Sequence, residues 1–355
     1  MPLLGLYRDM VRRRYQTPTR ADEIHRVLCA DGVRVCVKRC RPAPGAALRA
    51  LPVLCVPGLG ADSTNFDAPA PHGLAPWLAA QGFDTWIVDL RGTGLSMLAG
   101  RSQWSNVTFD DFVHLDMPAV LEHIAVTTGA PSVSWVGHSM GGLLLYAMVA
   151  AGRAGRVHAG VTLGSPIGFP RGFADVPWLG RLRGLGRYLS GLHVQELAQL
   201  LTPFAMRFDH PQLRRLVAYD NVDPAYVRRV MYRAIQSVPR GVLAQLGDWM
   251  ERDAFCSVDG TLDYRARLSG CALPVLVMGG QSDGIARLDA VRRAVDLLPN
   301  AEHVIAGRAA GFTADYGHID LLFGKRAHVE IYPRVRAFLA AHDHVARRTP
   351  LRVAS

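Results

Sequence analysis

Lysine is nearly absent from this chain. Only Lys38 and Lys325 are lysines, so arginine supplies almost all of the 40 basic residues, which against 30 acidic residues give a net charge of +10. A nucleic-acid-binding protein typically gathers its basic residues into one stripe, whereas these arginines are spread along the whole chain. We therefore do not expect nucleic acid as a partner.

Long apolar runs, an export signal and metal-binding patterns are missing as well. No apolar run approaches the roughly 18 residues of a membrane-spanning helix. The N-terminal arginines follow a very short apolar patch, which reverses the order found in a secretory signal. The six cysteines show no CxxC spacing, and no Cys or His pair elsewhere completes a zinc pattern with Cys36 and Cys40. We expect free thiols, no metal and a cytoplasmic location.

The chain does have enough apolar material for a packed core, with 49% hydrophobic and 20% charged residues over 355 positions. Its first 20 residues are predicted to form an arm. Apolar side chains there repeat at helical spacing ahead of Arg12, Arg13 and Arg14. A short helix packed on the body is the favoured interpretation, and contact between a basic amphipathic helix and a membrane surface is the alternative.

Short apolar strands alternate with helix-length segments along most of the chain. Ile24–Cys29 and Val33–Arg39 predict a hairpin, because apolar and polar residues alternate around an Asp-Gly turn. Further strands are predicted at 53–56, 85–88, 133–136, 161–163, 275–278 and 303–305, and helices at 74–81, 109–127, 140–151, 288–298 and 326–341. This pattern indicates an α/β fold with a mostly parallel central sheet and helices on both faces.

The alternation stops between about residues 169 and 263, where the pattern is helical only. Asp223-Pro224 is typical of a helix start, and an apolar stripe follows, made of Tyr226, Val230, Ala234 and Val238. We interpret 169–263 as a helical cap or lid inserted before the last two strands, with an extension of the core as the alternative. The remaining parts are the arm (1–20), the core (21–168 and 264–345) and a C-terminal tail (346–355).

The sharpest motif is Gly137-His138-Ser139-Met140-Gly141, which directly follows a predicted strand and directly precedes a predicted helix. A G-x-S-x-G pattern in this context is typical of a nucleophile elbow, in which the serine hydroxyl is exposed on a tight turn. The two glycines remove Cβ atoms that would clash where helix and strand approach. Ser139 is therefore the candidate nucleophile.

A nucleophilic serine needs a base and a group that orients the base. With an elbow of this kind the acid and then the histidine follow the serine along the chain. Asp283 lies in the loop after the strand at 275–278, and His318 lies in a glycine-bearing loop before a helix. We predict that His318 is the general base and that Asp283 orients it. Asp315 is at best a local partner of His318.

Two backbone N–H groups should bind the oxyanion that forms during attack on a carbonyl. We predict the N–H of Met140, directly after the nucleophile, and the N–H of Leu59, in the glycine-rich loop after the strand at 53–56. Seven large side chains of the insertion are candidates to line a pocket, although core packing is the more common use of such residues: Leu200, Leu201, Phe204, Met206, Tyr226, Met231 and Trp249.

Together these residues resemble the α/β-hydrolase superfamily, and within it the acid lipases and the bacterial polyester-synthase-like hydrolases. The likeness is carried by residues 73–78, 82–86 and 89–92, by 108–111 with 116–119, and by the histidine loop 317–324. The resemblance implies ester hydrolysis through an acyl-enzyme, with no cofactor. Two departures stand out: Pro57 replaces the usual histidine of the oxyanion loop, and Ser139 stands where the polyester synthases have cysteine.

We therefore predict a serine hydrolase that cleaves carboxylic esters with a hydrophobic acyl or alcohol portion, so that its partner is a small-molecule ester. An acyltransferase or a thioesterase with the same three residues is the alternative. A binding protein without catalysis is the third hypothesis, and the presence of all three residues argues against it. Serine at the elbow also disfavours dehalogenase and epoxide-hydrolase chemistry, which uses aspartate there.

Overall fold

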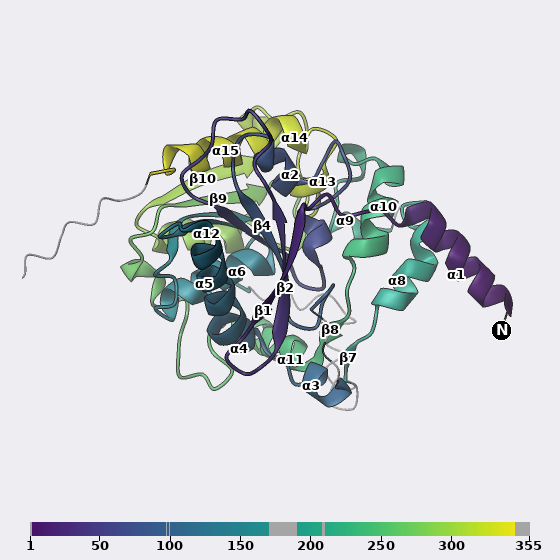
Figure 1. Cartoon of the computed structure of the whole chain (residues 1–355), viewed down its shortest axis with the longest axis horizontal. Coiled ribbons are helices and arrows are strands. Elements are labelled where there is room, and N and C mark those ends of the chain that lie inside the picture. The colour runs from purple at the N-terminus through teal and green to yellow at the C-terminus, as the bar shows by residue number, and fades with distance from the viewer. Residues whose placement is uncertain (1, 97, 99, 170–189, 208–209, 345–355) are drawn as a thin grey trace, which may run out of the picture.

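One mixed β-sheet runs through the middle of the molecule, and helices cover both of its faces (Figure 1). The computed structural model describes residues 2–96, 98, 100–169, 190–207 and 210–344. The strands of the sheet lie in the order β1-β2-β4-β3-β5-β6-β9-β10. Their bounds are β1 (Glu23–Leu28), β2 (Arg34–Cys40), β3 (Val53–Val56), β4 (Thr85–Asp89), β5 (Val133–His138), β6 (Val157–Leu163), β9 (Val275–Gly280) and β10 (Ala301–Ala306).

The pairing of these strands confirms the predicted sheet. The strands β1 and β2 form the hairpin, and β2 pairs antiparallel with β4. From β4 across to β10 each neighbouring pair is parallel. The carboxyl ends of these six strands therefore share one edge of the sheet, which is where α/β proteins usually place their ligand sites.

The sheet separates two hydrophobic cores. Because successive side chains of a strand point to opposite faces, β3 sends Leu54 and Val56 into one core, and Val53 and Cys55 into the other. The first core is covered by α4 (Phe109–Asp111), α5 (Met117–Thr128), α6 (Met140–Ala150) and α12 (Leu288–Leu297). The second is covered by α2 (Leu74–Ala79), α13 (Asp320–Phe323), α14 (Ala327–Glu330) and α15 (Tyr332–Ala341).

Two of the predicted helices are interrupted. The helix predicted at 109–127 contains a π-helical stretch, η2 (Phe112–Asp116), before α5, and the one predicted at 326–341 breaks at Ile331 between α14 and α15. Each break lies just before a proline, Pro118 or Pro333, near the start of the following helix. Proline has no backbone N–H, so it cannot continue the hydrogen bonds of the preceding turn.

The segment between β6 and β9 is mostly helical in its described part, which begins again at residue 190. It holds α8 (Gln195–Leu201), α9 (Pro211–Arg214), α10 (Pro224–Ala234) and α11 (Arg240–Arg252). It also holds two short antiparallel strands, β7 (Gly191–Leu192) and β8 (Val238–Pro239), so the prediction of a purely helical segment is wrong. The predicted apolar stripe continues past the end of α10 at Ala234, so its last member, Val238, lies outside the helix. The helix ends there because Ile235 forms a β-bridge with Ala61 of the core.

Short helical turns complete the described chain. They are η1 (Ser63–Asn65), α3 (Arg101–Ser105), η4 (Thr202–Phe204), η5 (Tyr219–Asn221), η6 (Leu268–Gly270) and η7 (Arg308–Ala310). All six cysteines lie in described parts of the chain, and all are buried and free, as expected. The predicted tail at 346–355 lies outside the described residues.

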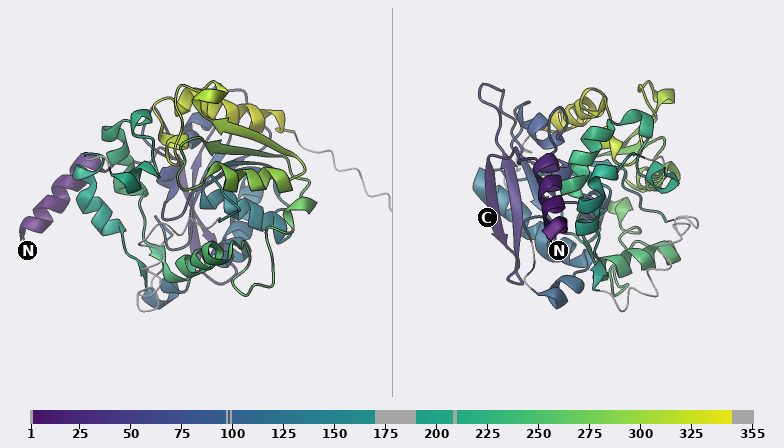
Figure 2. Two further views of the ribbon diagram at one scale, coloured as in Figure 1. Left: turned by 180° about the vertical axis from the view of Figure 1, so that it is seen from behind. Right: turned by 90° about the vertical axis from the view of Figure 1, so that its right-hand side faces the viewer.

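The N-terminal helix α1 (Pro2–Tyr15) projects from the body beside α8 and α10 (Figures 1 and 2). Its C-terminal half is packed, because Val11 and Tyr15 are buried against Tyr232. Its N-terminal half leaves Leu3 and Leu6 exposed to 81% and 67%. The helix is therefore packed on the body over only half its length. Within the described ranges, no helix combines the length and the apolar character needed to cross a bilayer.

A buried ion pair holds the loop that follows β4. The Arg91 guanidinium donates to Asp116 Oδ1 from Nε at 2.8 Å and to Asp31 Oδ2 from Nη1 at 2.7 Å. The Asp116 side chain is 0% exposed, whereas that of Asp31 is 33% exposed. Asp116 lies in η2, so the π-helical stretch places this carboxylate against the loop.

The two carboxylates should differ in their effect on stability. Asp116→Ala leaves part of a buried guanidinium unpaired, and we expect it to lower the free energy of unfolding by about 3–5 kcal/mol. Asp31→Ala removes a partly solvated partner of the same group and should cost about 1 kcal/mol or less. Urea unfolding of both variants checks this, and equal losses would show that burial does not set the cost.

Candidate active site

Ser139 occupies the turn between β5 and α6. Its backbone has φ 52° and ψ −117°, a conformation that non-glycine residues rarely adopt. The turn is held by a hydrogen bond of 2.8 Å from the Ser139 N–H to the Leu163 carbonyl of the neighbouring strand. Such strain is found where surrounding structure fixes a residue for function. Here it leaves Ser139 partly exposed at the carboxyl edge of the sheet.

The two glycines of the motif are required by close packing. A Cβ on Gly137 would lie 2.3 Å from the Gly141 carbonyl, and a Cβ on Gly141 would lie 2.0 Å from the Val56 carbonyl oxygen. Neither contact is tolerable for any side chain, because backbone cannot move aside as a flexible side chain can. The start of α6 thus lies directly against the end of β3, as the sequence motif predicts.

The structure brings Ser139, His318 and Asp283 into one row. The Ser139 Oγ lies 2.9 Å from His318 Nε2, and His318 Nδ1 lies 2.8 Å from Asp283 Oδ2. Asp283 follows β9 and His318 follows β10, so all three residues extend from the same edge of the sheet. The side chains of His318 and Asp283 are 6% and 0% exposed.

The second oxygen of Asp283 fixes the carboxylate in place. Its Oδ1 accepts from the N–H of Ile285 at 2.8 Å and from the N–H of Ala286 at 2.7 Å. Oδ2 therefore faces His318 and accepts from Nδ1–H, which leaves Nε2 without a proton and facing the serine hydroxyl. This tautomer can take a proton from Ser139. Asp315 accepts from the Arg308 N–H at 2.8 Å, and Asp283 is the carboxylate that pairs with His318.

The loop after β3 passes close to Ser139. A Cβ on Gly58 would lie 3.1 Å from Ser139 Cβ, so only glycine fits this approach without displacement. Within the described residues, no protein acceptor is hydrogen-bonded to the N–H of Leu59 or of Met140. Both groups are therefore free to bind an oxyanion, and Pro57 at the usual histidine position blocks neither of them.

Asn65 and His138 brace this loop, and neither was predicted. Asn65 Oδ1 accepts from the Gly58 N–H at 3.1 Å and lies 3.2 Å from His138 Nδ1. On the other side of the ring, His138 Nε2 donates to the His318 carbonyl oxygen at 3.1 Å when it carries the proton. His138 thus lies between the loop and the general-base candidate, and the two rings are 4.9 Å apart.

His138 is kept neutral in this position. Burial, together with the neighbouring His318, lowers the pKa of His138 to about 3. Its two neighbours are both oxygen acceptors, and a neutral imidazole has one proton to donate to them. A neutral His138 places no positive charge beside the His318 ring.

Gln236 ties the same loop to the inserted segment, and this contact was also missed. Its backbone N–H donates to the Gly60 carbonyl at 2.8 Å, and its Nε2 donates to Asp62 Oδ2 at 3.3 Å. Its Oε1 accepts from the Gly94 N–H at 3.2 Å. Gln236 and Asp62 are 174 positions apart, so no local pattern could pair them. By contrast, His138 and Asn65 lie close in sequence to the predicted site residues Ser139 and Leu59. That closeness could have indicated that they belong to the site.

The seven candidate pocket residues of the insertion do not come together at this site, and none of them lines the recess beside Leu59 and Met140. Trp249, for example, is fully buried among Phe109, Phe169 and Phe255. Core packing, the more common use, holds for this residue. Among the residues that the structure describes, no group of three or more His, Cys, Asp or Glu side chains is placed to hold a metal ion.

Comparison of the sequence with known protein families agrees with this architecture. The profile of the alpha/beta hydrolase fold family matches residues 52–324, which is most of the chain and includes Ser139, Asp283 and His318. The chain belongs to this family. The resemblance inferred from the sequence motifs is thereby confirmed at the level of the superfamily.

Sequence relatives are lipases, over part of their length. The chain is 34% identical to triacylglycerol lipase 2 of Arabidopsis thaliana over 137 residues, which are 35% of this chain and 32% of the relative. It is 34% identical to gastric triacylglycerol lipase of Rattus norvegicus over 90 residues, 24% of this chain and 23% of the relative. The chain thus matches between about a quarter and a third of the length of these lipases.

Solved structures share the fold over nearly the whole chain. A thermophilic esterase from Thermogutta terrifontis superposes with a TM-score of 0.61 at 18% identity, covering 91% of this chain and 100% of the esterase. At that identity the likeness concerns the fold alone.

Because His138 is neutral in the folded protein, the free energy of unfolding should depend on pH in the acid range. Below pH 6.5 the unfolded chain protonates His138 and the folded chain does not, so the free energy of unfolding falls as the pH drops toward 3. We expect this one group to remove about 3 kcal/mol between pH 7 and pH 4. In His138→Gln that component should vanish and the pH dependence of stability should flatten.

Urea unfolding at several pH values measures this difference. His193→Gln, at an exposed histidine on the inserted segment, controls for the substitution itself. If His138→Gln lost as much stability toward pH 4 as the wild type, His138 would not be the buried neutral group that the structure indicates.

Proposed function

We propose that this protein is a serine hydrolase that cleaves carboxylic esters through an acyl-enzyme intermediate. The observation that carries the proposal is the row of hydrogen bonds from Ser139 Oγ to His318 Nε2 at 2.9 Å and from His318 Nδ1 to Asp283 Oδ2 at 2.8 Å. An activated serine requires this arrangement of a nucleophile, a base and an orienting carboxylate.

The geometry supports a mechanism in two halves. In the first, Ser139 Oγ attacks the ester carbonyl carbon while His318 Nε2 takes the hydroxyl proton. Asp283 stabilises the resulting imidazolium through Nδ1–H, and the N–H groups of Leu59 and Met140 bind the oxyanion. His318 then gives its proton to the departing alcohol. In the second half, His318 activates a water that attacks the acyl-enzyme and releases the carboxylic acid.

Ester cleavage is favoured over other serine chemistry by the relatives. The matched sequences are named triacylglycerol lipases, and the superposed structure is named an esterase. These names concern those proteins. They support, for this chain, an ester with a hydrophobic acyl or alcohol portion. The inserted segment is proposed to act as a cap over this site, since Gln236 and Ile235 contact the oxyanion loop.

An acyltransferase or a thioesterase would use the same residues. The acyltransferase would differ from the proposed hydrolase in the acceptor that attacks the acyl-enzyme, and the thioesterase in having a thioester as the acyl donor. The expectations of no cofactor and of a cytoplasmic location remain predictions from the sequence, and a membrane contact through α1 remains the alternative to a helix packed on the body.

Loss of the serine hydroxyl should abolish the chemistry. We expect the wild type to be labelled by a fluorophosphonate probe and to hydrolyse p-nitrophenyl esters. Ser139→Ala should lose the label and lower kcat by on the order of 10⁴–10⁶-fold, because the nucleophile is gone. Ser165→Ala is the matched control: this buried serine follows the neighbouring strand β6, and its Oγ donates to the Leu163 carbonyl rather than to a histidine.

This experiment tests both the identity of the nucleophile and the proposed ester hydrolysis. Label and turnover that persist in a folded Ser139→Ala would exclude Ser139 as the nucleophile. A folded wild type with neither label nor turnover would overturn ester hydrolysis and favour the binding hypothesis.

Water should be the principal acceptor of the acyl group. With an ester donor and rising concentrations of an added alcohol or amine, product analysis by chromatography should show the free acid as the main product. A transfer product that dominates at low acceptor concentration would instead establish an acyltransferase. The Ser165→Ala control should give the same product ratio as the wild type.

A further inference from the structure

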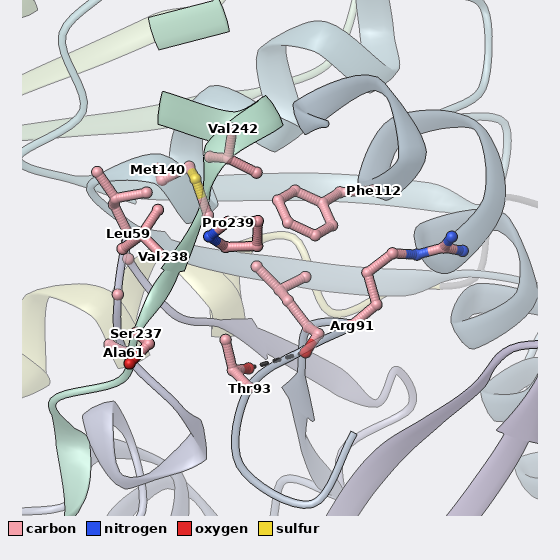
Figure 3. Close-up of a pocket in the computed structure, with 13 residues that line it drawn as sticks. Leu59, Ala61, Arg91, Thr93, Phe112, Met140, Ser237, Val238, Pro239 and Val242 are labelled. Carbon is pink, nitrogen blue, oxygen red and sulfur yellow. Dashed lines mark hydrogen bonds between the residues drawn. The ribbon is translucent and has the colours of Figure 1, made fainter. Parts of the chain in front are cut away.

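A small apolar recess opens beside the two candidate oxyanion donors (Figure 3). Gly58 lines it and lies against Ser139, so the recess adjoins the nucleophile. Its apolar walls come from five separate parts of the chain: the oxyanion loop, the loop after β4, η2, the start of α6 and the inserted segment. They include Leu59, Leu90, Phe112, Met140, Val238 and Val242.

The polar side chains of the lining already make hydrogen bonds within the protein. The Arg91 guanidinium is directed away from the recess in Figure 3 and pairs with Asp116 and Asp31. Thr93 Oγ1 donates to the Leu90 carbonyl at 2.8 Å, and Ser237 Oγ accepts from the backbone at 3.4 Å. These side chains offer few free groups to replace the water that a charged group would lose on entering, so the recess favours an apolar substituent.

The direction of the leaving group decides which half of an ester can enter. His318 Nε2 must protonate the departing alcohol oxygen, so the alcohol lies on the side of His318. The recess lies on the other side, against Leu59 and Met140, and its lining includes neither His318 nor Asp283. With the carbonyl oxygen between the two backbone donors, the substituent that points into the recess is the acyl chain.

The recess is also small. The recess has a volume of about 10 Å³, which is room for about one water molecule. Val238 and Val242, which are 5% and 1% exposed, close it from the inserted segment. The chemistry of the lining and the size of the recess thus both favour a short apolar acyl group.

We propose that this recess is the acyl-binding pocket, that it selects esters of short, uncharged acyl groups such as acetyl or propionyl, and that Val238 and Val242 set its length. The proposal rests on the proposed ester hydrolysis. It adds the substrate class, and it assigns a specificity-determining role to two residues of the inserted segment. The alcohol portion is left on the open side and carries the hydrophobic character of the substrate.

The test varies the two halves of the ester independently. One series keeps p-nitrophenol and lengthens the acyl group from acetate through butyrate to octanoate. The other keeps acetate and lengthens the alcohol. For the wild type, kcat/KM should fall at least about tenfold from acetate to octanoate, because overlong chains do not fit. In Val238→Ala and Val242→Ala the octanoate-to-acetate ratio should rise by about tenfold or more, while the alcohol series keeps its profile.

Val227→Ala is the matched control, because it removes the same atoms from a buried valine of α10 that packs in a different cluster and does not line the recess. It should leave both profiles unchanged. A wild type that prefers octanoate, or valine variants that change the alcohol profile instead, would overturn the acyl assignment while ester hydrolysis stands. A wild type that turns over no ester of either series would overturn the proposed function and this inference with it.

Discussion

The crowded turn between β5 and α6 is the constraint on which the site depends. The backbone at Val56 lies so close to residue 141 that a Cβ cannot be placed there, and Ser139 is held at a φ of 52° as a result of the same packing. Because the helix starts against the end of β3, the loop after β3 is brought to the nucleophile. The parallel sheet then supplies the other two residues of the row, since β9 and β10 end at the same edge.

The oxyanion loop is positioned from two sides. On the core side, Asn65 accepts from the Gly58 N–H, and His138 links this region to the His318 carbonyl. On the other side, the backbone of Gln236 donates to the Gly60 carbonyl. Loop and inserted segment therefore share hydrogen bonds. The same segment also walls the recess, so one piece of chain contacts both the loop of the candidate oxyanion donor and the proposed pocket.

The fold alone does not choose a substrate. The lipases that this chain resembles are matched over about a third of their length or less, and the superposed esterase is 18% identical. The support for the proposed specificity is local: apolar walls, polar side chains already bonded elsewhere, and a volume of about 10 Å³. If the acyl group enters this recess as proposed, the space is too small for a long acyl chain in this conformation.

The sequence by itself determined the α/β class, the hairpin, the order of strands and helices along the chain, and the three residues that the structure brings into one row, because each of these follows from a local pattern of neighbouring residues. It misjudged the purely helical insertion, and it did not foresee the π-helical stretch before Pro118 or the break at Ile331 before Pro333. It could not reveal the roles of His138 and Gln236 or the recess. Those depend on side chains far apart in sequence that meet only when the inserted segment packs on the loop after β3, and only the tertiary structure decides that packing.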